Sequence, residues 1–265
     1  MGFQEIIFER EGGIATLTLN RPDKLNSITP VTSREIVTVM EEVEADDKLK
    51  VLLLTGAGRA FCSGADLTKV TGGEAEGNSR KLNLNPFDWL GQVFLRFREL
   101  SKPTIAVING IVTGSGFSIS LGCDLRIASE EASFSLIFVK RGLMSGCGAT
   151  YHLPRLIGTA KALELMWTGD KFDAREAERI GLVNRVVPAG DLMKEARGLA
   201  ERIAMGPSVA IELSKRAVYK GLEANNFVAH MGYEAWAQNT CLGTEDFQEG
   251  LNAFLEKRPP VFKGK

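Results

Sequence analysis

Apolar residues follow two patterns in the first half of the chain. Residues 5–10 and 14–19 flank a Gly-Gly pair, and the second segment alternates apolar and polar positions, so this region predicts a β-hairpin. Residues 51–54 and 105–108 are instead continuous apolar runs, which are typical of strands buried on both faces of a sheet. A further strand is predicted over residues 124–128.

Helical patterns stand between these predicted strands. Apolar side chains recur at helical spacing over residues 31–45, directly after Thr29-Pro30, which resembles an N-cap followed by a proline at the first helical position. A second helix is predicted over residues 86–100. Alternating strands and helices favour an α/β fold with a largely parallel sheet.

The last third of the chain is predicted to be helical. After residue 159 only residues 182–187 have the pattern of a strand. The helices are predicted over residues 160–167, 174–180 and 191–203, followed by two more after Gly206-Pro207. We therefore expect an α/β core over residues 1–200 and a helical C-terminal segment over residues 201–265.

The composition excludes several classes of protein. The 265 residues include 32 Lys and Arg against 33 Asp and Glu, so no basic excess points to nucleic acid. Four scattered cysteines without metal-ligand spacing argue against a disulfide scaffold or metal site, and predict a reduced, cytoplasmic protein. The longest charge-free stretch, residues 104–123, contains four glycines and predicts strand, turn and short helix rather than a membrane span.

Two segments share a design that could hold a negatively charged oxygen. Residues 61–67 and 109–117 each lead from a predicted strand through a turn of tiny residues into a helix. The first N–H groups of a helix lack intrahelical partners and lie at the positive end of its dipole. Two such turns facing one point would supply a pair of oxyanion donors, but the same glycines could also serve tight packing alone.

Several longer motifs follow one another along the chain. They are Asn20-Arg21-Pro22 with Leu25-Asn26-Ser27, Phe61-Cys62-Ser63-Gly64-Ala65-Asp66-Leu67, Lys102-Pro103 through Asn109-Gly110 and Gly114-Ser115-Gly116 to Cys123-Asp124, Gly181-Leu182-Val183 to Val187-Pro188, and Thr244-Glu245-Asp246 to Lys257-Arg258. In this order they resemble the motifs of the enoyl-CoA hydratase/isomerase (crotonase) family. The resemblance covers essentially the whole chain.

The resemblance implies a fold and an activity. The expected fold is α/β and crotonase-like (ClpP/crotonase), a spiral of repeated strand–strand–helix units with C-terminal helices that form a homotrimer or a dimer of trimers. The expected substrate is an acyl-CoA thioester, so coenzyme A enters as part of the substrate and no permanent cofactor or metal is implied. The backbone N–H groups of Ala65 and Ser115 would form an oxyanion hole for lyase or isomerase chemistry.

The resemblance also assigns residues to binding. The predicted coenzyme A contacts are Lys24, Leu25, Ser63, Asp66, Leu67, Phe254 and Lys257. Backbone groups near Leu25 and Ser63 would cradle the adenine, and Lys257 would contact the phosphates with Phe254 beside it. The predicted acyl pocket comprises Phe138, Met144 and Trp89. For the last two the sequence does not separate a pocket role from a core role.

The sequence departs from the family pattern where hydratases carry two glutamates. Those positions correspond to Ser118 and Phe138, and neither side chain can act as a general base at neutral pH. Gly146 occupies the position where isomerases and dehalogenases often carry an aspartate. The apolar replacements favour a pocket for a bulky, cyclic or aryl acyl group.

Other polar residues are candidates for the missing acid or base. They are Ser118, Ser145, Cys147, His152, Glu74 and Glu76. Either serine could hold a substrate hydroxyl or a water, or could simply pack. The thiol lacks an evident base, the histidine follows a predicted helix start, and the two glutamates belong to a predicted surface segment.

Three functions stay open at this level. The first is an enzyme of the hydratase/isomerase type that stabilises a thioester enolate on a specialised enoyl-CoA. The second is an acyl-CoA-binding protein without catalysis, and the third is a hydrolase or ring-cleaving member that uses a serine-held water. In each case the partner is an acyl-CoA thioester, with no nucleic acid and no membrane.

Overall fold

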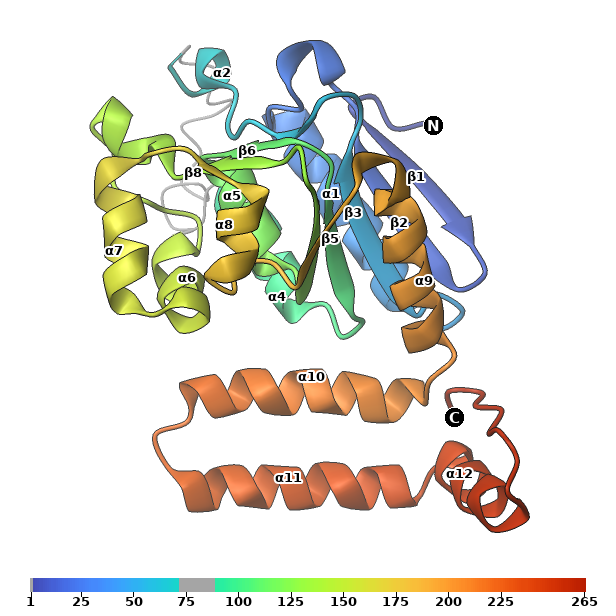
Figure 1. Cartoon of the computed structure of the whole chain (residues 1–265). Helices are drawn as coiled ribbons and strands as arrows, with labels where there is room; N and C mark the ends of the chain where they lie inside the picture. The colour runs from blue at the N-terminus through green and yellow to red at the C-terminus, as the bar shows by residue number, and fades with distance from the viewer. Residues whose placement is uncertain (1, 72–88) are drawn as a thin grey trace, which may run out of the picture.

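A six-stranded sheet with the order β1-β2-β3-β5-β7-β10 organises the molecule (Figure 1). The computed structural model describes residues 2–71 and 89–265. Strands β1 and β2 form the predicted antiparallel hairpin, and the strands from β2 onward pair in parallel. Their bounds are Ile6–Glu11, Ile14–Leu19, Val51–Gly56, Thr104–Ile108, Leu125–Ser129 and Arg185–Val187. The α/β prediction is confirmed.

A second sheet, with the order β4-β6-β8-β9, has no counterpart in the sequence-based prediction. Its strands are β4 (Ala60–Cys62), β6 (Ile111–Thr113), β8 (Ser133–Ser135) and β9 (Phe172–Asp173). Each has only two or three residues, too few to show a periodic pattern. Along the chain a strand of the large sheet, a strand of the small sheet and a helix succeed one another repeatedly, as in the expected strand–strand–helix spiral.

The helices that close these units are α2 (Leu67–Thr71), α5 (Ser115–Gly122) and the 3-10 helix η2 (Ile137–Arg141). Every residue of α5 is buried, so this helix lies in the interior. Charge-free residues 104–123 form a strand, a short strand and a buried helix, so the predicted strand and helix are confirmed, but the predicted turn contains the short strand β6. Across the two described ranges no helix combines the length and the apolar character needed to cross a membrane.

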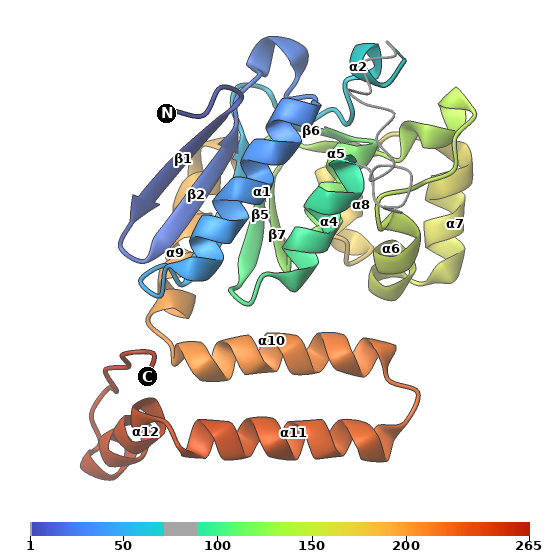
Figure 2. The ribbon, with the colours of Figure 1, turned by 180° about the vertical axis from the view of Figure 1, so that it is seen from behind.

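Both faces of the large sheet are covered. Helices α1 (Pro30–Ala45) and α4 (Trp89–Glu99) lie on one face, and α9 (Leu192–Ala204) lies on the other (Figures 1 and 2). Along β3, Leu52 and Leu54 belong to the main core with α1 and α4, whereas Leu53 packs with Ala196 of α9. This two-sided burial explains why the central strands are continuous apolar runs.

The remaining core helices are α6 (Ala149–Ile157), α7 (Thr159–Thr168) and α8 (Ala174–Arg179). Beyond them, the predicted pair of C-terminal helices is wrong, because the structure has three: α10 (Ser208–Glu223), α11 (Phe227–Leu242) and α12 (Glu245–Glu256). Thr244 separates the last two, since its hydroxyl caps α12 by accepting a hydrogen bond from the N–H of Phe247.

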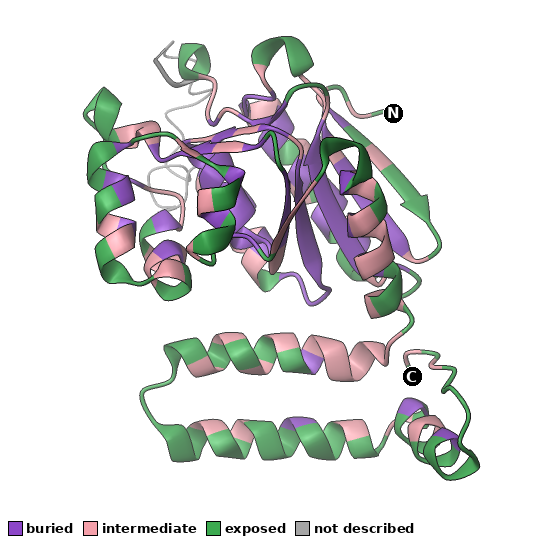
Figure 3. Cartoon of the chain, viewed as in Figure 1, coloured by how far each residue is buried: buried purple, intermediate pink, exposed green. Residues whose placement is uncertain are grey.

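The C-terminal helices are attached to the core by polar contacts and are largely exposed (Figure 3). Lys215 and Tyr219 of α10 reach the Asp124 carboxylate at 2.8 and 2.7 Å. The expected boundary between residues 200 and 201 falls within α9, and Ala200 is buried against the large sheet. The division of the chain into two parts stays a prediction.

Candidate active site

The buried side chain of Asn26 anchors the segment that lies against the first glycine turn. Its amide donates hydrogen bonds to the carbonyl oxygens of Ala57 at 2.9 Å and Ala60 at 2.7 Å. Its amide oxygen accepts the N–H of Arg21 at 2.9 Å. Leu25 and Asn26 both adopt a positive φ, which is uncommon outside glycine and must be held by surrounding contacts. The Asn26 amide supplies these contacts.

Ala65 lies at the centre of a short parallel bridge with Ile28. The N–H of Ile28 donates to the carbonyl of Gly64, and the N–H of Asp66 donates to the carbonyl of Ile28, both at 2.8 Å. In a parallel bridge the central residue directs its own N–H to the opposite side. Accordingly, none of the described residues accepts a hydrogen bond from the N–H of Ala65.

The second glycine turn leads from β6 into α5. The hydroxyl of Thr113 donates to the carbonyl oxygen of Ser63 at 2.9 Å, which ties this turn to the first. A Cβ at Gly116 would lie 2.4 Å from the carbonyl oxygen of Cys62, so only glycine fits. Ser115 is the first residue of α5, and its N–H has no acceptor within residues 2–71 and 89–265.

The two turns are in direct contact. A Cβ on Gly64, whose φ is +98°, would lie 3.0 Å from the carbonyl oxygen of Thr113 and 3.2 Å from the nitrogen of Ser115. A Cβ on Gly114 would lie 4.0 Å from the Cα of Gly64. Because the glycines allow this approach, the N–H groups of Ala65 and Ser115 come from adjoining backbone segments and line the same cavity.

This cavity has a volume of about 200 Å³ and two chemically distinct ends. The donor end consists of Ser63, Gly64, Ala65, Gly114 and Ser115. The apolar end consists of Leu67, Leu90, Ile137, Phe138 and Leu143. Arg141 and Cys147 complete the described lining, which contains no carboxylate and no imidazole.

The sequence matches a family of enzymes over nearly its full length. The family model described as "Enoyl-CoA hydratase/isomerase" matches residues 9–265. The chain belongs to the enoyl-CoA hydratase/isomerase family. This membership shows that the protein is an enzyme of that family and accounts for the strand–strand–helix spiral, which is the crotonase fold.

Individual relatives agree with this assignment. The chain is 38% identical to the short-chain-enoyl-CoA hydratase of Clostridium acetobutylicum over 97% of both chains. It is 36% identical to the 1,2-epoxyphenylacetyl-CoA isomerase of Escherichia coli over 98% of both. Among solved structures, an enoyl-CoA hydratase from Bacillus anthracis has a TM-score of 0.89 and 35% identity, covering 99% of this chain and all of its own.

The two serines at or near the vacant family positions have different surroundings. The hydroxyl of Ser118 is buried and donates to the carbonyl oxygen of Gly146 at 3.1 Å, so it ties α5 to the loop before α6 rather than lining the cavity. The hydroxyl of Ser145 is also buried, but it has no hydrogen-bond partner in the described part of the chain. Gly146 has no atoms within 4 Å of where a Cβ would lie.

The other acid–base candidates are only partly at the cavity. Cys147 lines it with a positive φ, whereas His152 does not line it. Burial, with the nearby guanidinium groups of Arg98 and Arg126, lowers the pKa of the His152 imidazole to about 4, so the ring is neutral near pH 7. Glu74 and Glu76 lie outside the described residues.

Three of the family's expected coenzyme A contacts lie together. The N–H of Ser63 donates to the carbonyl oxygen of Leu25 at 2.9 Å, and its hydroxyl donates to that of Lys24 at 3.4 Å. Leu67 lines the cavity nearby. Asp66 is occupied, because the Thr68 hydroxyl and Arg21 bind its carboxylate and hold its pKa below the ordinary value.

Phe254 and Lys257 are not brought to these contacts within one chain. Phe254 lies on α12 and is 80% exposed, and Lys257 ends that helix in a left-handed conformation. Figure 1 shows α12 at the opposite end of the molecule from α2, whose residue Leu67 lines the cavity. A single chain therefore supplies only part of the expected coenzyme A site.

Of the predicted acyl-pocket residues, Phe138 lines the cavity. Met144 does not, since it is 75% exposed, and its neighbour Leu143 takes the place at the apolar end. Leu143 is itself 55% exposed, so only part of its side chain faces the cavity. Trp89 begins α4, and its side chain lies outside the described part of the structure.

Four lining residues were not predicted from the sequence: Leu90, Ile137, Arg141 and Leu143. A signal for Arg141 was present, because it follows Phe138 by three positions. In a 3-10 helix, residues i and i+3 lie on the same face, and η2 contains both residues. Without the prediction of a 3-10 helix in this segment, the pairing of the two side chains could not be inferred.

Proposed function

We propose that this enzyme stabilises the enolate of an acyl-CoA thioester during hydration, dehydration or double-bond migration. The observation that carries the proposal is the pair of N–H groups at Ala65 and Ser115, which line one cavity and lack described acceptors. Negative charge develops on the thioester oxygen as the enolate forms. Two fixed donors there would stabilise it, and the loss of one such donor costs roughly 3–4 kcal/mol in comparable sites.

We further propose a bulky, cyclic or aryl acyl group. Phe138, Leu90 and Leu143 give the apolar end a hydrocarbon surface, and a relative at 36% identity is named 1,2-epoxyphenylacetyl-CoA isomerase. The proton transfers are proposed to involve Glu74 or Glu76, since the described lining offers neither a carboxylate nor an imidazole.

The test is turnover of a panel of linear, cyclic and aryl enoyl-CoAs, followed by mass spectrometry. Incorporation of deuterium at the α-carbon of saturated analogues in D₂O reports enolate formation directly. Ala65→Pro removes the donor and should lower both signals by about 10²-fold, whereas Ala65→Ser keeps the N–H and should stay close to wild type. Absence of both turnover and exchange for every thioester would overturn the proposal.

A second candidate function is acyl-CoA binding without conversion. It is favoured by the lack of any carboxylate or imidazole in the described cavity lining. Isothermal titration calorimetry would then show binding of acyl-CoA at micromolar concentrations or below, with no product and no α-proton exchange. Parallel exchange measurements on the Glu74→Gln and Glu76→Gln variants separate the two functions, because only an enzyme has an α-proton exchange rate that these substitutions can lower.

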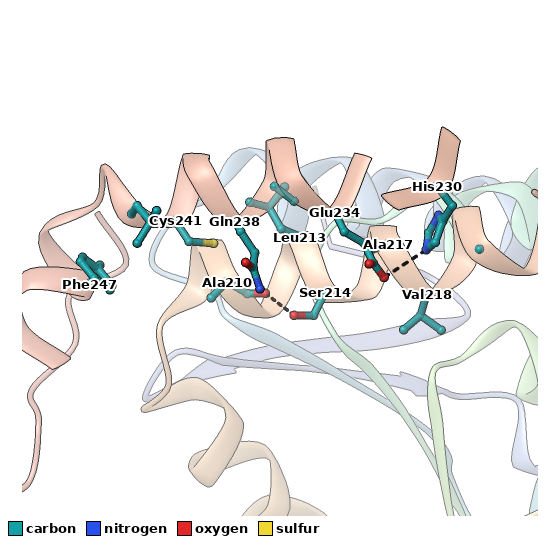
Figure 4. Close-up of a pocket in the computed structure, with 13 residues that line it drawn as sticks. Ala210, Leu213, Ser214, Ala217, Val218, His230, Glu234, Gln238, Cys241 and Phe247 are labelled. Carbon is teal, nitrogen blue, oxygen red and sulfur yellow. Dashed lines mark hydrogen bonds and ion pairs between the residues drawn. The ribbon is translucent and has the colours of Figure 1, made fainter. Parts of the chain in front are cut away.

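We propose that residues 201–265 assemble the chain into a homotrimer or dimer of trimers, and that a second copy supplies Phe254 and Lys257 to the coenzyme A site. Phe227 and Val228 of α11 are 75% and 77% exposed. A groove of about 840 Å³ lies between α10 and α11 (Figure 4). Sedimentation should show a trimer or hexamer, and Val228→Asp should shift it toward monomer.

We also propose a cytoplasmic location, supported by the chemistry of the cysteines. All four cysteines, Cys62, Cys123, Cys147 and Cys241, lie within the described residues, and none of them forms a disulfide. Burial raises the pKa of the Cys62 and Cys123 thiols to about 12, so both stay protonated and unreactive. Cell fractionation followed by thiol labelling tests the location, since an oxidising compartment would leave few thiols to label.

A further inference from the structure

Arg141 is the charged residue of the described cavity lining, and its neighbour has a different role. Phe138 and Arg141 occupy the first and last positions of an i, i+3 pair in η2 and both line the cavity. Lys140, one position earlier, instead forms an ion pair with Asp170 at 3.1 Å on the surface. The 3-10 helix therefore separates two adjacent cations, one at the cavity and one away from it.

The guanidinium of Arg141 has no counter-charge among the described residues. None of them forms an ion pair or hydrogen bond with its side chain, and the described lining contains no carboxylate. Asp66, close to the donor end, is bound by Arg21 and Thr68. A ligand that enters the cavity thus meets one cation, the neutral groups of the donor end, an apolar wall and no described anion.

We infer that Arg141 selects acyl-CoA thioesters whose acyl group carries a second negative charge, a carboxylate at the end remote from the thioester. This inference rests on the proposed function, because it assumes that the thioester oxygen lies at the donor end. Guanidinium matches a carboxylate with two parallel hydrogen bonds, and such charged pairs are stronger and more specific than neutral ones. Arg141 is itself exposed, so solvent partly screens this attraction.

The anion that Arg141 meets could also be a phosphate of coenzyme A, so the test varies both parts of the substrate. Pairs of enoyl thioesters of equal length, ending in methyl or carboxylate, are prepared on coenzyme A and on N-acetylcysteamine, which has no phosphate. Arg141→Met removes the charge with little change in bulk, and Arg141→Lys keeps the charge without the planar fork. Lys140→Met is the matched control from the same helix.

The expected result is that wild type prefers the carboxylate-ended thioester on both carriers. Arg141→Met should lower kcat/KM for that substrate by about 10- to 100-fold and leave the methyl-ended substrate within about twofold. The kcat/KM of Arg141→Lys for the carboxylate-ended substrate should lie between the values of wild type and Arg141→Met. Lys140→Met should resemble wild type for both substrates.

Two outcomes would overturn the inference. If Arg141→Met lowers kcat/KM for both acyl groups on coenzyme A but for neither on N-acetylcysteamine, Arg141 binds a phosphate of coenzyme A. If wild type shows no preference for the carboxylate, the side chain plays no part in selection. If no thioester turns over, calorimetry on the same acyl-CoA pairs still measures the binding preference for the carboxylate. Failure of the proposed catalytic function can therefore be distinguished from failure of the proposed role of Arg141.

Discussion

The donor end and the apolar end of the cavity are fixed by different means. At the donor end the backbone itself is locked, since Gly64 and Gly116 leave no room for a Cβ and Asn26 holds the adjoining segment through buried hydrogen bonds. At the apolar end side chains form the wall: Leu143 is 55% exposed, and a Cβ at Gly146 would meet no described atom within 4 Å.

This difference predicts that substitutions at the two ends have different effects. Substitutions of Gly64 or Gly116 at the donor end should damage folding, because they strain a close-packed backbone. Substitutions at the apolar end should change which substrate reacts, because its side chains can be exchanged at little structural cost. The predictions below challenge this division, beginning with the largest expected effect.

A methyl group added at each end provides the most direct contrast. Gly116→Ala places a Cβ 2.4 Å from the Cys62 carbonyl oxygen, so we expect a loss of about 3 kcal/mol or more in the free energy of unfolding. Gly146→Ala meets nothing within 4 Å and should stay within about 0.5 kcal/mol of wild type. Urea unfolding measures the free energy of unfolding of both variants. Equal losses would refute the distinction between a tightly packed donor end and a tolerant apolar end.

A carboxylate introduced at the apolar end should create activity rather than destroy the fold. Phe138→Glu places a general base in the cavity, and burial raises its pKa toward neutrality. Hydration of crotonyl-CoA should then rise on the order of 10²-fold. Phe138→Gln is the matched control, since it has similar bulk and no basic oxygen. A gain in both variants would show that space, not proton transfer, limits the reaction.

The region behind the apolar end should be sensitive to acid through His152. Its pKa is about 4 in the folded chain against about 6.5 when unfolded, so both states are neutral above pH 6.5. As the pH falls from 6.5 toward 4, the unfolded state binds the proton first and stability declines. Allowing for partial exposure, the loss is about 1–2 kcal/mol. His152→Gln should reduce the decline in the free energy of unfolding between pH 6.5 and 4. An unchanged slope would show that another group causes the decline.

The smallest effect is expected at Ser145, whose buried hydroxyl has no described partner. Because an unpaired buried polar group is costly, Ser145→Ala should be neutral or stabilising by up to about 1 kcal/mol. Thermal unfolding checks this expectation. A loss of turnover with unchanged stability would instead show that the hydroxyl meets the substrate or a bound water.

The sequence predicted the long elements because their signals are local. The hairpin, α1, and strands β3 and β5 each carry a complete hydrophobic pattern or cap. Strands such as β4 and β9 are defined by their pairing with segments distant in the sequence. Two or three residues are too few to reveal such a pairing through a hydrophobic pattern. The helix break at Thr244 was overlooked although the capping residue was visible.

The candidate site divides in the same way. The glycine turns were recognisable because tiny residues between a strand and a helix have a direct structural meaning. Met144 was misplaced because loop geometry decides which of two neighbouring side chains faces inward. Phe254 lies in α12 and Lys257 ends it, and α12 lies at the opposite end of the molecule from α2 (Figure 1), a separation that no local pattern in the sequence measures.

The hydrogen bond from the Thr113 hydroxyl to the Ser63 carbonyl couples the two glycine turns. The relative position of the two turns is consequently held by their main chains and by this one side-chain hydrogen bond, not by the side chains of the apolar end. Residues of η2 and the following loop can therefore be replaced one at a time while the main-chain geometry of the two glycine turns is retained. New substrate preferences can arise through single amino-acid substitutions that leave the two glycine turns unchanged.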